Sequence, residues 1–282
     1  MNYRYILIVV QLALLALSTS AKGGNEHEPV SARVLGQGRC SLLIPDCWAA
    51  INNVGALHSD TGIINAGIYT GSNWTNSFPG ISALAISKQI KRGSIIGAGI
   101  LRNGSLLYSE TRIVAGFSRK INCVQIGLGG SYISNQTAGL NTTGAMIMEF
   151  GCVANIEKLT LGANLYNITN SYIGSEKNKA AIPQSFRGGA KYSIHSNVSL
   201  SAEYYYSQTL KSLFRVGTEF TIDSLVNIRG GYESGTKLMT FGVGLNLKHT
   251  NLDFVTIYQP ILGPAIMFSA NFKINFRKAN KD

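Results

Sequence analysis

Charged residues are scarce in this chain of 282 residues. Asp, Glu, Lys and Arg together make up 14% of it, whereas soluble domains usually contain about 25%. After its N-terminus the chain also lacks any second apolar run long enough for a membrane-spanning helix. These two absences argue against a typical soluble domain and against a helical membrane protein. A mean hydropathy of +0.11 is normal for a membrane β-barrel, in which only every other residue faces lipid.

Motifs of catalysis and metal binding are missing as well. The sequence contains no G-x-S-x-G, no Walker loop and no H-E-x-x-H, and its four Cys lie in no metal-ligand spacing. The four His fall in a predicted tail, at the end of a non-strand segment and in two predicted turns: His27, His58, His195 and His249. We therefore expect no enzymatic activity, no metal site and no cofactor.

The net charge of +11 does not by itself indicate a nucleic-acid partner. The positive residues are scattered singly and gather at predicted turns rather than in one patch. Anionic lipid head groups and lipopolysaccharide explain such a surface equally well. We expect the lipid and lipopolysaccharide of an outer membrane as surroundings, and no nucleic acid.

Residues 1–21 have the three parts of a secretory signal peptide. Arg4 provides a positive start, residues 6–17 form an apolar stretch, and Ser18-Thr19-Ser20-Ala21 offers small residues for cleavage. The apolar stretch is about 12 residues long, which is short for a membrane-spanning helix. An uncleaved anchor is the alternative. Export leads to an oxidising compartment, in which cysteines can form disulfides.

The four cysteines allow three pairings, and the sequence does not choose among them. Cys40 and Cys47 are close in sequence and enclose the Pro45-Asp46 turn signal, so this is the pair that we expect to form a disulfide. The alternative is that both are buried free thiols that pack against Trp48.

Residues 22–60 precede the first regular strand pattern and are predicted to form a tail and a hatch. Residues 22–29 are polar, and residues 31–60 show no sustained alternation. Gly36, Gly38 and the Pro45-Asp46 turn signal, followed by the helix-prone stretch 47–51, indicate a compact and partly helical element. Such a segment cannot be a barrel strand, so we expect it inside the lumen or just beneath it.

The clearest strand pattern lies at 265–276. Successive side chains of a strand point to opposite faces, and here the face formed by the even positions is entirely apolar. At about 12 residues the strand is long enough to cross a bilayer at a tilt. We predict that five large side chains of this face contact lipid: Ile266, Phe268, Phe272, Ile274 and Phe276.

Residues 61–276 contain about fourteen alternating runs, and residues 277–282 follow as a C-terminal tail. The runs are 62–74, 81–91, 94–102, 107–119, 123–134, 144–155, 158–169, 186–195, 198–207, 213–222, 225–233, 237–248, 251–259 and 265–276. The predicted fold class is all-β, a transmembrane antiparallel β-barrel of about 14 strands with the hatch in its lumen. A soluble β-sandwich is the alternative, but it predicts shorter strands and more charge on the outer face.

Long and short connections alternate along the barrel segment. The longer ones are 72–80, 103–106, 135–143, 170–185, 207–212, 234–236 and 260–264, and the others are nearly all tight. Outer-membrane barrels have long outer loops and short periplasmic turns, so the pattern predicts a location in a bacterial outer membrane.

If the apolar positions face lipid, the positions between them face the lumen. These carry charges of both signs: Glu149, Arg187, Lys191, Glu203, Arg215, Glu219, Arg229, Glu233, Asp253 and Lys273. Mixed signs favour pairing across the lumen over an ion filter of a single sign. The residues either line a polar conduit or hold the hatch in place, and simple hydration of the interior is a third interpretation.

Two segments resemble a known family. In 31–59, ten residues match an N-terminal signature: Ala32, Arg33, Gly36, Gly38, Asp46, Trp48, Ala49, Asn53, Gly55 and Leu57. Near the end, Leu252-Asp253-Phe254, Tyr258 and the loop 260–263 are similar to the same family's closing hairpins. The family is the PorV/PorQ group of Bacteroidetes outer-membrane proteins, which are relatives of the FadL transporters. Val54 in place of a Pro, and Arg39-Cys40 in place of Gly-Ala, depart from the signature.

The resemblance implies a fourteen-stranded barrel with an N-terminal hatch. It also implies a non-enzymatic role as an accessory of type IX protein secretion, with a partner or cargo protein docked on the outer loops or the barrel wall. The alternative is a FadL-like conduit for small hydrophobic molecules, which would use the hatch and three aromatic residues of the outer side: Trp74, Phe78 and Tyr172.

Overall fold

A computed structural model describes residues 25–72, 80–175, 178–210 and 212–275. The predicted signal peptide (1–21), the C-terminal tail (277–282) and Phe276 lie outside these residues. Among the described residues, no helix is both long and apolar enough to cross a membrane.

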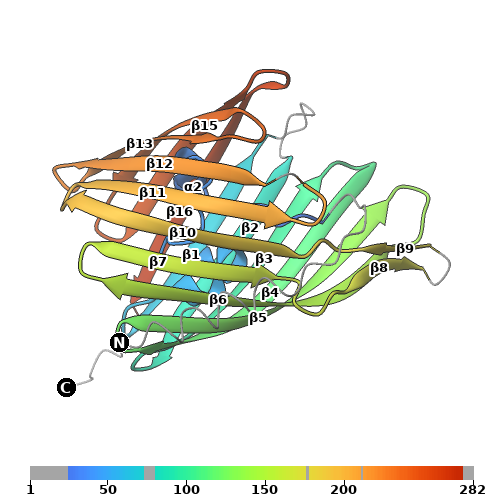
Figure 1. The fold of residues 1–282 in the computed structure, drawn as a ribbon, viewed down its shortest axis with the longest axis horizontal. Helices are drawn as coiled ribbons and strands as arrows, with labels where there is room; N and C mark the ends of the chain where they lie inside the picture. Colours follow the sequence, from blue (N-terminus) through green and yellow to red (C-terminus); the bar gives the residue numbers. More distant parts are fainter. Residues whose placement is uncertain (1–24, 73–79, 176–177, 211, 276–282) are drawn as a thin grey trace.

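Fourteen antiparallel strands close into a barrel, as the alternation predicted (Figure 1). In chain order they are β1 (Ile63–Gly71), β2 (Ile81–Lys91), β3 (Ser94–Gly104), β4 (Tyr108–Ile121), β5 (Val124–Thr137), β6 (Thr143–Ile156), β7 (Leu159–Tyr166), β10 (Ser185–His195), β11 (Val198–Ser207), β12 (Leu213–Ile222), β13 (Val226–Glu233), β14 (Leu238–Asn246), β15 (Thr250–Gln259) and β16 (Gly263–Asn275). Each strand pairs with its neighbour in sequence order, β7 with β10, and β1 with β16 closes the ring. Closure leaves no open edge in the barrel sheet.

One hairpin lies outside the barrel. Strands β8 (Tyr172–Ser175) and β9 (Asn178–Ala181) pair with each other within the connection between β7 and β10. The sequence pattern predicts this whole connection as loop, because strands of four residues are too short to show a period of two. We call the barrel end that carries this hairpin the outer end, and the opposite end, where β16 ends at Asn275, the inner end (Figure 1).

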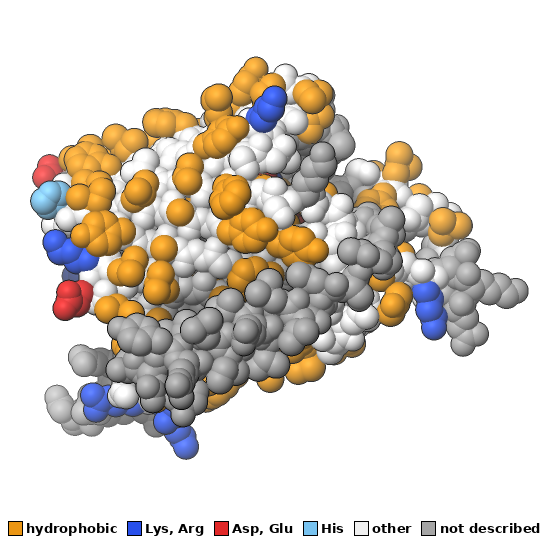
Figure 2. All heavy atoms as spheres, in the orientation of Figure 1, with side chains coloured by type: hydrophobic (Ala, Val, Ile, Leu, Met, Phe, Trp, Pro, Cys, Tyr) orange, Lys and Arg blue, Asp and Glu red, His pale blue; other side chains and the backbone are white. Residues whose placement is uncertain are grey.

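Strand alternation separates a lipid-facing surface from the lumen. In β16, Ile266, Phe268 and Ile274 are 50%, 41% and 43% exposed, whereas Ala265 and Met267 are 1% and 8% exposed. Phe272 shares the outward face of these residues and is half-buried. Figure 2 shows hydrophobic side chains spread over the visible wall and charged side chains mainly towards its ends. Such a band of apolar residues is the surface that a transmembrane barrel presents to lipid.

The segment before β1 fills the lumen as a hatch. It contains two short helices, α2 (Ala32–Gly36) and α3 (Ala49–Asn52), and a 3-10 helix, η1 (Val54–Ala56). Helix α2 contacts β13–β16, α3 contacts β2–β4, and η1 contacts β4–β6. The hatch therefore touches the wall on several sides, and its residues are nearly all buried.

Inward-facing glycines let the hatch approach the wall closely. A Cβ atom on Gly127 of β5 would lie 2.5 Å from the carbonyl oxygen of Val54, and one on Gly151 of β6 would lie 2.0 Å from Asn53 Oδ1. Such short contacts exclude any larger side chain. Part of the glycine content of the strands therefore serves the fit between hatch and wall.

Membrane insertion of the wall is testable at β16. Replacing Phe268 with Arg places a charge near the middle of the strand, and we expect a loss of about 2–4 kcal/mol of unfolding free energy in lipid vesicles. Replacing Ile274, near the inner end of the same face, with Arg should lower the unfolding free energy by only about 0–1 kcal/mol. Urea unfolding, followed by heat-modifiable gel migration, measures both. Equal costs at the two positions contradict this placement of the bilayer.

Candidate functional site

One group of buried charges ties α2 to the wall. Arg33 donates from Nε and Nη2 to the two carboxylate oxygens of Glu219 on β12, at 3.2 and 3.0 Å. Gln37, which follows α2, donates to Glu219 Oε2 at 3.2 Å. Arg229 on β13 donates from Nε to Glu219 Oε2 and from Nη1 to Asp253 Oδ1, each at 2.6 Å. A single carboxylate thus receives donors from both the hatch and the barrel.

A second group lies towards the outer end. Arg215 on β12 donates from Nη1 to Glu203 Oε1 at 2.9 Å and from Nε to Glu233 Oε2 at 2.7 Å. The antiparallel register places both carboxylates directly opposite Arg215 on the neighbouring strands β11 and β13. Arg39 of the hatch joins the group, with its Nε 3.4 Å from Glu233 Oε2, and it also pairs with Glu28.

Backbone amides of the hatch complete this second group. The N–H groups of Ser41 and Leu42 both donate to Glu203 Oε2, each at 2.9 Å. Glu203 is 3% exposed, so these bonds replace the hydration that the carboxylate loses on burial.

A third group surrounds the end of α3. Arg112 on β4 donates to Glu149 Oε2 on β6 at 3.3 Å and to the carbonyl oxygen of Ile51 at 3.4 Å. Arg187 on β10 donates to Asn164 Oδ1 at 2.8 Å and to the backbone carbonyl of Asn52. Both arginines therefore bind carbonyl oxygens near the C-terminus of α3, where cations are favoured.

Two of these contacts pass over a glycine. Arg229 and Asp253 lie on β13 and β15, which flank β14, and a Cβ on Gly244 of β14 would lie 2.5 Å from Asp253 Oδ1. Likewise, a Cβ on Gly129 of β5 would lie 3.0 Å from Glu149, which reaches across β5 towards Arg112. Glycine on the middle strand leaves room for pairs that skip a strand.

Most predicted lumen residues are buried inside the barrel. Glu149, Arg187, Glu203, Arg215, Glu219, Arg229, Glu233 and Asp253 are all less than 9% exposed. Lys191 faces inward near the inner end but is only half-buried, and Lys273 at the same end is exposed; neither forms an ion pair within the described residues. The interior charges therefore act mainly in pairing and in holding the hatch.

Sequence reasoning missed several partners. Arg112 is 4% exposed and belongs to the third group. The sequence did indicate that Arg112 faces inward, because it lies on the strand face opposite to the apolar residues Ile113 and Phe117. Gln37, Glu28 and Arg39 were not predicted because a segment without strand periodicity gives no indication of which side chains meet the wall.

Besides Arg33, four of the predicted hatch residues have fixed partners. Trp48 is fully buried and donates from Nε1 to Asn271 Oδ1 on β16 at 2.5 Å. Asn53 donates to the carbonyl oxygen of Leu42 at 2.7 Å and accepts from the amide of Gly55 at 3.1 Å. Gly38 donates its amide to Thr240 Oγ1 at 3.0 Å, which itself donates to the carbonyl oxygen of Gly36 at 3.1 Å.

Asp46 lies beside a hollow of about 190 Å³ that is open at the inner end. Burial raises the pKa of Asp46 to about 7, although the charge of Arg33 acts in the opposite direction. His27 behaves differently, because burial together with the charges of Arg187 and Arg112 lowers its pKa well below the usual range. The imidazole of His27 is therefore neutral.

The expected disulfide is not formed, because Cys40 and Cys47 are both free. Their thiols point to different strands: Cys40 Sγ lies 3.9 Å from the carbonyl oxygen of Ser201 on β11, and Cys47 Sγ lies 3.7 Å from Asn271 Oδ1 on β16. The structure thus contains the alternative, two buried thiols. Among the described residues, no three His, Cys, Asp or Glu side chains form a group suited to a metal ion.

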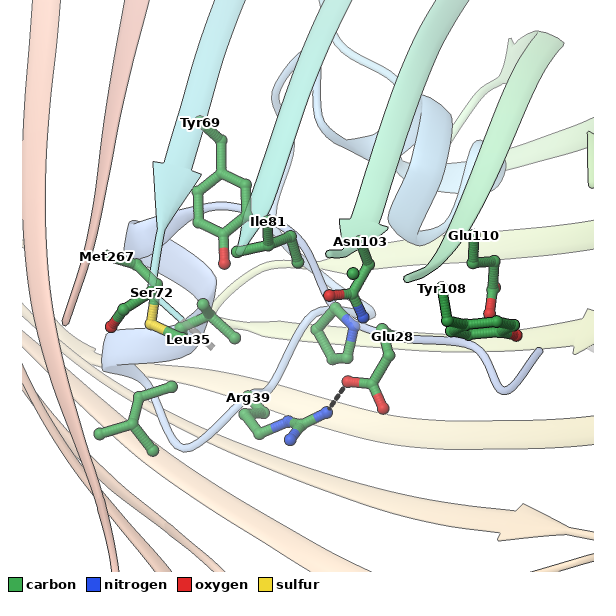
Figure 3. A pocket seen from close by; sticks show the side chains of 13 residues that line it. Glu28, Leu35, Arg39, Tyr69, Ser72, Ile81, Asn103, Tyr108, Glu110 and Met267 are labelled. Carbon is green, nitrogen blue, oxygen red and sulfur yellow. Dashed lines mark hydrogen bonds and ion pairs between the residues drawn. The ribbon is translucent and has the colours of Figure 1, made fainter. Parts of the chain in front are cut away.

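A cavity of about 450 Å³ lies between the hatch and the outer end (Figure 3). Leu35 of α2 and wall residues Ile81, Ile257 and Met267 give it an apolar side. Tyr69 of β1 adds an aromatic ring, which also packs edge-on against Trp48 at 6.2 Å between ring centres. A space of this size and lining suits a small hydrophobic molecule. Of the three aromatic residues expected on this side, Trp74 and Phe78 lie outside the described residues, and Tyr172 is exposed in β8.

The seating of the hatch depends on Gly38, which has φ +63°. A Cβ there would lie 2.2 Å from the carbonyl oxygen of Val216 and 2.6 Å from the amide of Tyr232. We expect Gly38→Ala to lower the free energy of opening the hatch by more than about 1 kcal/mol. The rate of maleimide labelling of Cys40 should then rise about tenfold.

The labelling is done with Cys123 and Cys152 replaced by Ser, and peptide mapping identifies the modified thiol. Gly139→Ala is the matched control, because Gly139 has φ +77° but open space around its Cβ position. Identical labelling of Cys40 in the two variants contradicts a tightly seated hatch.

No protein-family model and no curated protein match the chain. Its fold is similar to that of solved channels. A deltaS2 mutant of the TodX monoaromatic hydrocarbon channel has a TM-score of 0.68 at 11% identity, and the match covers 89% of this chain and 100% of that one. The toluene transporter TodX of Pseudomonas putida has a TM-score of 0.63 at 10% identity, with coverages of 92% and 100%. The CymD monoaromatic hydrocarbon channel has a TM-score of 0.61 at 11% identity, with coverages of 93% and 100%.

At these identities the similarity establishes the fold. It gives no support to the PorV/PorQ group in particular. The N-terminal signature that suggested PorV/PorQ is instead explained by packing: Gly36, Gly38, Trp48 and Asn53 seat a hatch against a barrel wall. The chain has the barrel fold of the TodX and CymD channels.

Proposed function

We propose that this protein is an outer-membrane conduit for small hydrophobic molecules. The observation that carries the proposal is the cavity of about 450 Å³ at the outer end, whose apolar side is formed jointly by hatch and wall. A barrel that served only to hold a docked partner has no need for an apolar space inside it. We prefer this function to the secretion-accessory role, because the similar solved structures are described as hydrocarbon channels.

The division of the lumen supports a guided path rather than a wide pore. Strands β15, β16, β1, β2 and β3 contribute the apolar cluster around Trp48 and Tyr69, whereas β10–β13 contribute most of the paired charges. A hydrophobic solute that enters at the outer end therefore finds one apolar wall, and the ion pairs on the other wall hold the hatch below it. Orientation with the outer end towards the cell exterior follows from the longer connections there.

The similar structures support the same function. TodX and CymD are described as monoaromatic hydrocarbon channels, and they share the barrel fold over nearly the whole chain. Since fold alone does not determine a ligand, the cavity and not the similarity carries the argument.

Blocking the cavity tests the function. Ile81 of β2 lines the cavity, and Leu84 of the same strand is 53% exposed on the lipid-facing side. The chain is expressed in a bacterium that lacks its own hydrocarbon channels, and the initial rate of [14C]toluene uptake is measured. We expect Ile81→Trp to lower uptake to the level of the empty vector, because the indole occupies the cavity, and Leu84→Trp to retain the wild-type rate. Uptake by Ile81→Trp at the wild-type rate, or by the wild type at the vector rate, contradicts the proposal.

A further inference from the structure

Carboxylates gather around the outer cavity. Glu28 and Glu110 line it together with Arg39 (Figure 3). They also line an adjoining cavity of about 250 Å³ together with Glu26, Asn25 and Arg112. Both cavities lie above the hatch, so a molecule in the larger one is within reach of these side chains. An apolar space next to several acidic groups is not what a plain hydrocarbon requires.

Acidic and basic side chains are unequal in number in this region. The outer half of the lumen contains six carboxylates, Glu26, Glu28, Glu110, Glu149, Glu203 and Glu233, and four guanidinium groups, Arg39, Arg112, Arg187 and Arg215. His27, the nearest imidazole, is neutral because burial lowers its pKa. Among the described residues the carboxylates therefore outnumber the guanidinium groups by two.

Glu26 has no cation of its own among the described residues. Its carboxylate accepts hydrogen bonds from Tyr205 at 2.7 Å and from Ser207 at 2.9 and 3.0 Å, and it also accepts one from Thr209. Burial raises the pKa of Glu26, and the charge of Glu28 adds to the increase. Hydroxyl groups thus satisfy its oxygens, and no cation pairs with it among the described residues.

The other two carboxylates share their arginines with deeper partners. Arg39 pairs with Glu28 but is also 3.4 Å from Glu233. Arg112, two residues after Glu110 in β4, directs Nη2 to Glu149 at 3.3 Å and Nε to Ser131 at 3.1 Å. Glu110 forms no ion pair within the described part of the chain and receives a hydrogen bond from the backbone of Asn25.

An independent observation also indicates a missing donor. Asn25 is 6% exposed and lines the smaller cavity, and its Oδ1 atom has no hydrogen-bond partner in the described residues. A buried acceptor without a partner is unfavourable unless a ligand or water supplies the donor. The acceptors of the site, which are carboxylates and an amide oxygen, all suit a group that only donates.

We propose that the outer cavity selects hydrophobic molecules that carry a protonated amine. The ammonium group has three donors and one positive charge, which fit the carboxylates Glu26, Glu28 and Glu110 and the amide oxygen of Asn25. The hydrocarbon part lies against Leu35, Ile81 and Met267, and Tyr69 and Tyr108 add aromatic rings to the lining, which can attract a cation. The inference rests on the proposed function for the route that the ligand takes, but not for its binding.

Binding to purified, detergent-solubilised protein tests the inference. Titration calorimetry at pH 7 compares three probes of one shape, 3-phenylpropylamine, 3-phenylpropionate and propylbenzene. We expect the amine to bind at least about tenfold more tightly than the carboxylate, because their charges interact with the cavity with opposite sign. Heat-modifiable migration confirms that each protein sample is folded.

Variants assign the preference to the cavity. Glu110→Gln should remove most of the advantage of the amine, and Glu28→Gln should reverse it, because Arg39 then lacks its outer partner. Glu157→Gln, in the exposed turn between β6 and β7, is the matched control and should bind like the wild type. Equal affinity of wild type for amine and carboxylate overturns the inference, as does an unchanged preference in both Glu110→Gln and Glu28→Gln.

The outcome is separable from that of the proposed function. If the protein takes up toluene but binds the amine and the carboxylate with equal affinity, the proposed conduit stands and selection of amines is rejected. Preferential binding of the amine without toluene uptake supports the cavity's selectivity and rejects the hydrocarbon conduit.

Discussion

Charge burial is the constraint on which the rest of the structure depends. A closed barrel in lipid encloses its inward-facing charges, and a buried charge without a partner costs several kcal/mol. Arg215 and Arg229 of the wall pair with Glu203 and Glu219, and the hatch supplies the remaining donors, the amides of Ser41 and Leu42 for Glu203 and the side chains of Arg33 and Gln37 for Glu219. Barrel and hatch therefore form one polar network, and neither satisfies it alone.

The same constraint shapes the space that remains. Most of the paired charges lie on β11–β13, whereas β15, β16 and β1–β3 supply much of the apolar cluster around Trp48 and Tyr69. The outer cavity lies where the two meet, with Leu35 and Met267 on one side and Glu28 and Arg39 on the other. The mixed lining of the cavity results directly from this division. The contacts that hold the hatch therefore also determine which kind of molecule can bind above it.

Much of the fold was predictable from the sequence, because period-two alternation reports directly which residues face lipid. It revealed fourteen strands and eight buried charges, but it could not reveal their partners, since Glu219 meets Arg33 only through a contact between segments 186 residues apart. The hairpin β8–β9 was too short to show a period. The predicted Cys40–Cys47 disulfide was wrong, because proximity in sequence does not specify in which direction two side chains point. The cavity could not be predicted, because residues of the hatch, β1, β2 and β16 form it jointly.

Hydrogen exchange of the hatch tests the central claim most directly. If the charge network holds the hatch, mass spectrometry of the detergent-solubilised protein will find peptides from 32–57 exchanging as slowly as those of β11–β13. Glu219→Gln will accelerate exchange in the hatch while the strands stay protected, and Glu157→Gln will change neither. Exchange of the wild-type hatch within seconds, beside protected strands, would contradict the account.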